Sequence, residues 1–160
     1  MELKSSGNRL HIIGLTALVA VAAALPAHDA TAASATAIKS HATGNCLAAA
    51  TTLPGARVIQ TACTGEAIQL WESEYIGGDT RLRNKQTGLC MAVSGGSLSG
   101  GAVVLQENCS MATSQFWLKF TDNTVRSKNS GLCLALSLNG MTTEQRNCAS
   151  VNDQKWTVSF

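Results

Sequence analysis

The sequence predicts an all-β protein in which three copies of one unit close a barrel. After residue 36 no stretch keeps apolar residues at helical spacing. Short alternating runs recur there roughly every 8–12 residues, separated by Gly, Ser and Asn turns. Related residues also return at a nearly constant interval, three times over. About four strands in each copy give about twelve strands, which a closed threefold barrel holds without exposed edges.

The N-terminal segment is set apart by its composition. Of the 160 residues 45% are hydrophobic, and these residues concentrate before residue 33. Lys4 and Arg9 precede an uncharged apolar run over 12–25, and small residues follow it. This order is typical of a secretory signal peptide, and the run is short for a membrane span. We therefore expect residues 1–32 to be a leader, cleaved near 32–35, and the protein to be secreted without stable membrane insertion; an uncleaved or lipid-modified anchor is the alternative.

Charge and cysteine content exclude several classes of function. A formal net charge of +2 is too small for a nucleic-acid-binding surface. The six cysteines are even in number and their spacings match no zinc site, which favours disulfides over metal or redox chemistry. His41 is the one histidine after the leader, and no spacing singles out two carboxylates. We expect no catalysis, no metal and no cofactor.

The repeat occupies residues 36–160, in copies over about 37–77, 80–120 and 123–160. Each copy holds a Thr-Gly or Ser-Gly turn before a cysteine, in the runs Thr43-Gly-Asn-Cys46, Thr87-Gly-Leu-Cys90 and Ser130-Gly-Leu-Cys133. A second cysteine follows, at Cys63, Cys109 and Cys148. Each copy then reaches Gln-x-Trp, at Gln69–Trp71, Gln115–Trp117 and Gln154–Trp156.

This threefold pattern resembles the ricin B-type lectin family over residues 36–160, in three motifs out of three. The resemblance implies the β-trefoil fold and carbohydrate binding. It also implies that the motif Gln and Trp belong to the core, where the indole fills the barrel and the Gln amide binds backbone. A large side chain with a single donor suits that position. The expected structural residues are Gln69, Trp71, Gln115, Trp117, Gln154 and Trp156.

The repeat symmetry also ranks the cysteine pairings. Six cysteines allow fifteen connectivities. One connectivity keeps every pair within its own copy: Cys46–Cys63, Cys90–Cys109 and Cys133–Cys148. Each bond closes a short loop and is expected to stabilise the fold by about 3 kcal/mol.

The sugar site that the resemblance implies is altered in every copy. In the family, an Asp lies two residues after the first cysteine and an aromatic residue two before the second. Here the first position holds Ala48, Ala92 and Ala135, and the second holds Thr61, Glu107 and Arg146. Without the carboxylate and the aromatic face, which grip hydroxyls and cover C–H groups, ordinary galactose binding is not expected. The second and third copies keep more polar residues, and the candidate glycan-binding residues are Gln106, Glu107, Gln115, Gln145, Arg146, Asp153 and Gln154.

Basic residues recur at a position that this sugar site does not use. The six residues form the pairs Lys39 and His41, Arg83 and Lys85, and Arg126 and Lys128. Because residues two apart on a strand share a face, each copy presents one pair. Contacts to an anionic polysaccharide or an acidic partner are one interpretation; a solvated strand face is the other and is favoured.

Two functions stay open. The first is a secreted, non-enzymatic carbohydrate-binding protein whose partner is a glycan or polysaccharide, an anionic one included. The alternative is a sugar-dead trefoil that serves as a protein-interaction or scaffold subunit of a secreted assembly, such as a toxin delivery component. Alanine at all three Asp positions favours the alternative, whereas the usual activity of the family favours the first.

Overall fold

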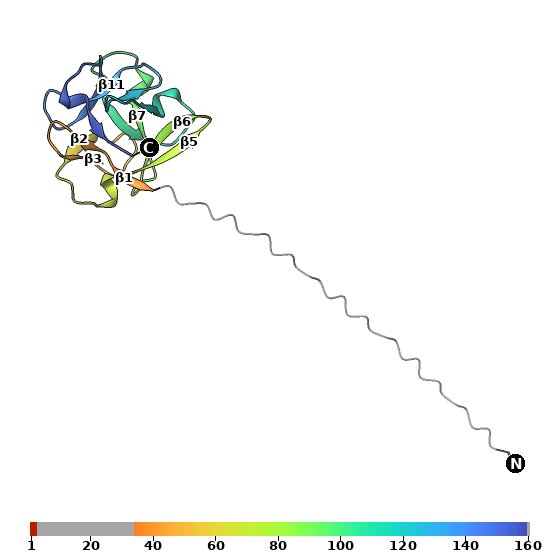
Figure 1. The fold of residues 1–160 in the computed structure, drawn as a ribbon. Helices are drawn as coiled ribbons and strands as arrows, with labels where there is room; N and C mark the ends of the chain where they lie inside the picture. Colours follow the sequence, from red (N-terminus) through yellow and green to blue (C-terminus); the bar gives the residue numbers. More distant parts are fainter. Residues whose placement is uncertain (3–33, 160) are drawn as a thin grey trace. The chain divides into compact units, whose positions relative to one another are not determined.

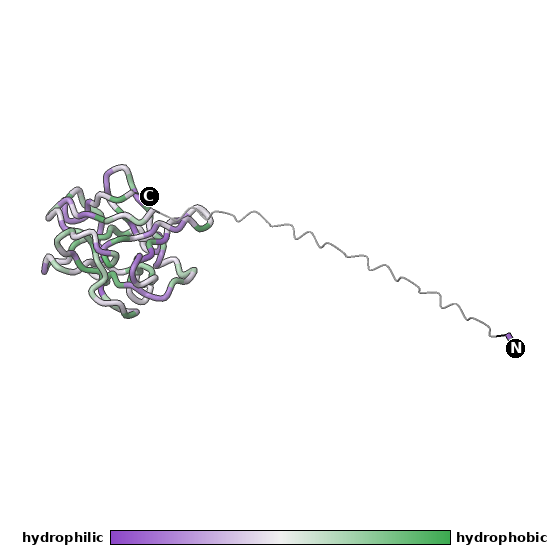
Figure 2. Tube along the Cα trace, turned by 90° about the horizontal axis from the view of Figure 1, so that it is seen from below, coloured by the Kyte–Doolittle hydropathy of each residue, from purple (hydrophilic) through white to green (hydrophobic). Residues whose placement is uncertain are grey.

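The computed structural model describes residues 1–2 and 34–159, and residues 34–159 form one folded unit (Figure 1). The expected leader, apart from its first two residues, lies outside the described part of the chain. Among the residues described, secondary structure consists of short strands and 3-10 turns. Short hydrophobic stretches alternate along them with hydrophilic ones (Figure 2). None of the helices in this part is both long and apolar enough to cross a membrane.

Thirteen strands make up the unit, close to the twelve expected, because the first barrel strand is interrupted at Ile38. The strands are β1 (Ala35–Ala37), β2 (Lys39–Ser40), β3 (Cys46–Ala49), β4 (Val58–Thr61), β5 (Leu70–Ile76), β6 (Asp79–Asn84), β7 (Cys90–Val93), β8 (Val104–Glu107), β9 (Phe116–Lys119), β10 (Val125–Ser127), β11 (Cys133–Leu136), β12 (Thr143–Arg146) and β13 (Trp156–Thr157). The 3-10 turns are η1 (Ala67–Gln69), η2 (Ser94–Gly96), η3 (Thr113–Gln115) and η4 (Asn152–Gln154).

One set of strands forms a closed antiparallel ring. Strand β1 pairs with β5, β5 with β6, β6 with β9 and β9 with β10, while β2 pairs with β13. The ring closes between β10 and β13, where Thr124 bridges Lys155 and the Trp156 N–H donates to Asn123 O at 2.9 Å. Closure satisfies backbone groups that an open sheet would leave at its edges.

The remaining strands form three hairpins, β3–β4, β7–β8 and β11–β12. An isolated bridge joins each pair of hairpins: Arg57 to Leu105, Ile59 to Thr142 and Val103 to Glu144. A barrel whose three hairpins contact one another in this cyclic way is a β-trefoil. The fold class predicted from the repeat is confirmed.

The three motif tryptophans lie fully buried in the core, as expected. Their Nε1 atoms donate to backbone oxygens of Leu47 at 3.1 Å, Met91 at 3.0 Å and Leu134 at 2.9 Å. Each acceptor is the residue after the first cysteine of the same copy. The indole therefore fills the core and joins the last strand of its copy to the first hairpin strand, which explains the repeated spacing.

The motif glutamines fasten the loop that follows each hairpin. Gln115 Oε1 accepts from the Ser110 N–H at 2.8 Å, and its Nε2 donates to Asn108 O at 2.9 Å. Gln69 and Gln154 make the equivalent contacts in their own copies. All three predicted disulfides are present, Cys46–Cys63, Cys90–Cys109 and Cys133–Cys148. The disulfides follow the expected pairing, and the motif glutamines bind backbone within their own copies.

Candidate functional site

Polar groups at the altered sugar positions concentrate in the third copy. The alanines at the family's Asp position lie buried on β3, β7 and β11. Across the hairpin, Ala48 faces Ile59 and Ala92 faces Leu105, so two copies present apolar pairs. Ala135 instead faces Glu144. The third copy therefore carries a carboxylate beside the position where the family has its own.

A groove of about 460 Å³ lies at this position. Its lining comes from two copies: a glycine pair from the η2–β8 loop, and residues of β12 and the following loop. The lining residues are Gly100, Gly101, Glu144, Arg146, Asn147, Ala149, Val151 and Gln154. The Gly101 N–H donates to Gln145 O at 2.8 Å, which holds the loop against β12. The volume falls in the range of small-molecule sites, about 300–1,000 Å³.

Arg146 is held between two carboxylates at this groove. Its Nη2 donates to Asp153 Oδ2 and, at 2.9 Å, to Leu136 O. Its Nε lies 3.4 Å from Glu144 Oε1, without the direction of a hydrogen bond. The side chains of Glu144, Arg146 and Asp153 keep 17%, 26% and 35% of their surface exposed. This charged trio is thus preorganised and partly open to solvent.

Two atoms of the charged trio keep unused hydrogen-bonding capacity. Arg146 Nε and Asp153 Oδ1 are shielded from solvent and make no hydrogen bond within the described residues. A shielded polar atom without a partner costs free energy, and such atoms call for an explanation. One donor and one acceptor therefore remain to be satisfied next to the groove.

The structure corrects the assignment of three predicted glycan-binding residues, Gln106, Gln115 and Gln145. All three are buried. Gln106 Nε2 donates to Thr51 O at 2.8 Å and Leu53 O at 3.1 Å, and its Oε1 accepts from Thr87 Oγ1 at 2.8 Å. Because their amides bind the protein itself, these residues hold loops in place and offer a ligand no free group.

The other four predicted residues are distributed unevenly. Arg146 and Asp153 come together in the charged trio. Gln154 lines the groove, although its amide is committed to Ala149 N and Asn147 O. Glu107 is half-buried at the end of β8 in the second copy, opposite Cys90, and is not brought to the groove.

Sequence analysis missed a second set of structural glutamines, Gln60, Gln106 and Gln145, which we name the clasp glutamines. Each accepts a hydrogen bond from the Thr or Ser of its own Thr/Ser-Gly turn. Each also donates to the hairpin loop of the preceding copy: Gln60 to Gly140, Gln106 to Thr51 and Leu53, and Gln145 to Ser97 and Ser99. A signal was available, because each stands three residues before the second cysteine.

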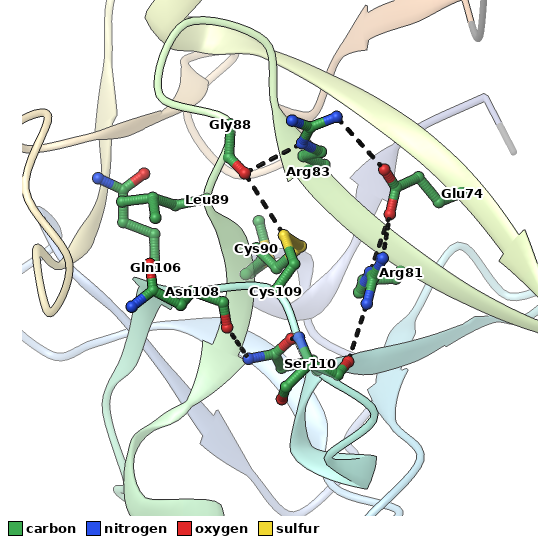
Figure 3. Close-up of a disulfide and its surroundings, with 12 residues drawn as sticks. Glu74, Arg81, Arg83, Gly88, Leu89, Cys90, Gln106, Asn108, Cys109 and Ser110 are labelled. Carbon is green, nitrogen blue, oxygen red and sulfur yellow. Dashed lines mark hydrogen bonds and ion pairs between the residues drawn. A yellow bond between two sulfur atoms is a disulfide. The ribbon is translucent and has the colours of Figure 1, made fainter.

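Three of the six recurring basic residues form ion pairs within the described residues. Arg83 Nε donates to Gly88 O at 3.0 Å, and the carboxylate of Glu74 lies between Arg83 and Arg81 (Figure 3). Arg126 pairs with Asp122 at 3.1 Å, and Lys128 pairs with Asp79. For these copies the contacts favour the solvated-face interpretation.

Two family models match the chain. The ricin-type β-trefoil lectin domain matches residues 78–159, which is half of the sequence. The chain belongs to the ricin-type β-trefoil lectin family. A second model, the ricin-type β-trefoil lectin domain-like family, matches residues 27–107. No curated protein matches the sequence of this family member.

Several solved structures share this fold. The designed threefold-symmetric protein ThreeFoil has a TM-score of 0.70 and 24% identity, over 75% of this chain and 94% of that one. An exo-β-1,3-galactanase from Clostridium thermocellum has a TM-score of 0.71 and 20% identity, over 76% of this chain and 29% of that one. The lectin of Polyporus squamosus, solved with a sialylated epitope, has a TM-score of 0.67 and 22% identity, over 76% of this chain and 46% of that one. The chain thus spans less than half of the last two proteins, and these likenesses show the fold.

Proposed function

We propose that this lectin-family domain is a secreted, non-enzymatic protein that binds a glycan in the groove of its third copy. The observation that carries the proposal is the charged trio: Glu144 and Arg146 line a groove of about 460 Å³, and Asp153 pairs with Arg146. Arg146 stands at the family's aromatic position and Glu144 faces Ala135 at the family's Asp position, which supports the groove as a sugar site with different polar groups. Arginine and carboxylates here take the place of the family's Asp and aromatic residue.

The chemistry of this wall suits hydroxyl groups. Carboxylate oxygens of Glu144 and Asp153 accept hydrogen bonds from sugar hydroxyls, and the Arg146 guanidinium donates to hydroxyl or ring oxygens. The small apolar side chains of Ala149 and Val151 supply surface for the C–H face of a sugar ring. Two carboxylates against one guanidinium leave an excess negative charge, so we propose that the sugar held by the trio itself is neutral.

Similar proteins support a glycan as the class of ligand. The Polyporus squamosus lectin was solved with a sialylated glycan, and the Clostridium thermocellum neighbour is named as a galactanase. These descriptions concern those proteins. For this domain they support the carbohydrate class, while the altered residues argue for a different sugar.

The proposal is tested with a glycan array and three forms of the disulfide-intact protein: wild type, Arg146→Ala and Glu107→Ala. Glu107 is the matched control because it occupies the equivalent position of the second copy. Loss of charged hydrogen bonds at about 1.5–3 kcal/mol predicts binding weakened about 10–100-fold in Arg146→Ala, with Glu107→Ala unchanged. Absence of wild-type binding to every glycan, or equal effects of both substitutions, contradicts the proposal.

A protein partner is the second candidate, and exposed leucines favour it. Leu53, Leu98 and Leu138 lie in the three hairpin loops and are 67%, 66% and 96% exposed. Contiguous exposed apolar patches mark contact surfaces, whereas single exposed leucines are ordinary; it is the recurrence of an exposed leucine in every hairpin loop that favours a partner. If this candidate is right, one partner co-purifies with wild type from culture supernatant and is lost when all three leucines become Ser, whereas glycan binding is unaffected.

A further inference from the structure

The barrel contains three equivalent strand pairs, which we name seams. At each seam the first strand of one copy meets the last strand of the preceding copy: β2 with β13, β6 with β5, and β10 with β9. Their outward cross-strand pairs are Lys39 with Thr157, Arg83 with Glu72, and Arg126 with Leu118. The same position therefore faces a carboxylate at the second seam and a hydroxyl at the first.

The next register position separates the seams further. The backbone N–H of His41 donates to Lys155 O at 3.0 Å, that of Lys85 to Leu70 O, and that of Lys128 to Phe116 O. Lys155 thus replaces an apolar residue of the other two seams. Cross-strand and diagonal neighbours on one face lie within about 8 Å. The β2–β13 seam brings Lys39, His41 and Lys155 together on its outer face.

Internal carboxylates do not neutralise this cluster. Glu74 serves Arg83 at the second seam, and Asp122 and Asp79 serve the basic pair at the third. No ion pair within residues 34–159 involves Lys39, His41 or Lys155. Lys39 and His41 are exposed and Lys155 is half-buried. Three basic side chains without an ion pair among the described residues therefore lie together at this seam, whereas the second seam has Lys85 alone.

A hollow of about 220 Å³ lies next to Lys155. Arg126, Thr124 and Ser150 line it, together with Asp122, whose oxygens are occupied by Thr124 and Arg126. Ala149 lines both this hollow and the groove of the third copy. The two depressions are thus adjacent. Glu144 and Arg146 balance each other in the groove lining, whereas the hollow carries Arg126 and Lys155 against one carboxylate, Asp122. An extended ligand can occupy both.

We propose that the β2–β13 seam and its hollow bind the sulfate or carboxylate groups of an acidic polysaccharide whose neutral portion lies in the groove. The inference rests on the proposed glycan-binding function for the class of ligand, but it uses different residues. Ammonium and guanidinium groups form charge-assisted hydrogen bonds with these anions, and the unbalanced charge favours an acidic chain over a neutral one.

The test compares binding of the disulfide-intact protein to heparin and to desulfated heparin. The seam variant is Lys39→Ala with Lys155→Ala; the control, Lys85→Ala with Lys128→Ala, removes the same charge from the other seams. We expect the seam variant to bind heparin about three- to tenfold more weakly, the control to bind as wild type, and desulfated heparin to bind more weakly than heparin. Equal losses in both variants, or no preference for sulfation, overturn the inference.

Two further measurements separate the sources of the anion and the two proposals. Sodium sulfate and sodium chloride are compared, at equal ionic strength, as competitors of heparin binding. If sulfate, but not chloride, displaces heparin fully at low millimolar concentration, the seam binds the free anion and the polysaccharide inference is wrong. Neutral-glycan binding is measured in the seam variant and in Arg146→Ala. If no neutral glycan binds in a way that depends on Arg146, but heparin binding still depends on Lys39 and Lys155, the groove proposal is wrong and the seam proposal holds. If neutral-glycan binding depends on Arg146 but heparin binding is unchanged in the seam variant, only the seam proposal is wrong.

Discussion

The Thr87 hydroxyl donates a hydrogen bond of 2.8 Å to Gln106 Oε1, and this contact joins the Thr-Gly turn of the second copy to its third strand, β8. The other end of the same amide holds the hairpin loop of the first copy through Thr51 and Leu53. Gln60 and Gln145 repeat the arrangement in the other copies. The clasp glutamines therefore link the copies in a cycle, which strand pairing within one copy cannot do.

Replacement of a clasp glutamine is expected to destabilise the fold. Gln106→Ala removes the acceptor of the Thr87 hydroxyl and the side-chain donor to Thr51 O, and it opens a cavity, at a cost of about 3 kcal/mol in the free energy of unfolding. Gln60→Ala, at a half-buried position, costs less because water replaces the lost contacts. Urea denaturation measures both. A cost below 1 kcal/mol for Gln106→Ala, on the order of an exposed site, would show that the cycle is not structural.

The core tryptophans are expected to be required for their donor as well as their volume. Trp117→Phe removes the hydrogen bond to Met91 O and part of the core volume, so unfolding becomes easier by about 2–4 kcal/mol. Trp71→Phe and Trp156→Phe give costs of the same order because their acceptors are equivalent. Thermal unfolding followed by circular dichroism checks this. If Trp117→Phe leaves the melting temperature unchanged, the indole hydrogen bond has no role in stability.

The disulfides are expected to differ in their effect on binding. Removal of either Cys46–Cys63 or Cys133–Cys148 by paired Ala substitutions lowers the free energy of unfolding by about 3 kcal/mol. Of these two disulfides only Cys133–Cys148 flanks the groove, since the lining residues Asn147 and Ala149 lie on either side of Cys148. Glycan affinity below the melting temperature therefore falls in the Cys133/Cys148 variant and stays constant in the other. Equal affinities would place the sugar site elsewhere.

Acid is expected to weaken one interaction at the third seam. Hydrogen bonds from the Thr124 hydroxyl and backbone, and then the charge of Arg126, hold the pKa of Asp122 below its ordinary value of 3.8. The stabilisation is thus present above that value and disappears as the pH falls through the folded-state pKa. Wild type melts at a higher temperature than Asp122→Asn at pH 7, and the two converge toward pH 2. The assignment is wrong if the difference in melting temperature between wild type and Asp122→Asn stays constant with pH, or if Glu66→Gln shows a similar pH-dependent difference.

Sequence was sufficient for the fold because the features that build the core recur at constant spacing. The Trp side chains and the cysteines are such features, and each has the same partner in every copy. Glutamine was ambiguous by contrast, since the same amide can grip a sugar or a loop. Burial distinguishes these roles, and burial of Gln106 and Gln145 depends on loops about 45–55 residues away in the chain.

The site was only partly predictable for the same physical reason. Arg146 stands at the family's aromatic position and Asp153 directly precedes the motif residue Gln154, so position alone selected them. Their ion pair, and the approach of Gly100 and Gly101 from another copy, depend on tertiary contacts. The imbalance of charge among the seams depends likewise on register: Lys155 joins Lys39 and His41 only because β13 pairs with β2.

The central claim is that glycan binding has been retained in the third copy with a new set of polar groups. Backbone amide chemical-shift mapping of the nitrogen-15-labelled, disulfide-intact domain, titrated with a glycan that binds on the array, tests this most directly. The account predicts that the largest shifts fall at Gly100, Gly101 and residues 144–154, and that they are absent in Arg146→Ala. Largest shifts in the hairpin of the first or second copy, with the 144–154 segment unchanged, would contradict it.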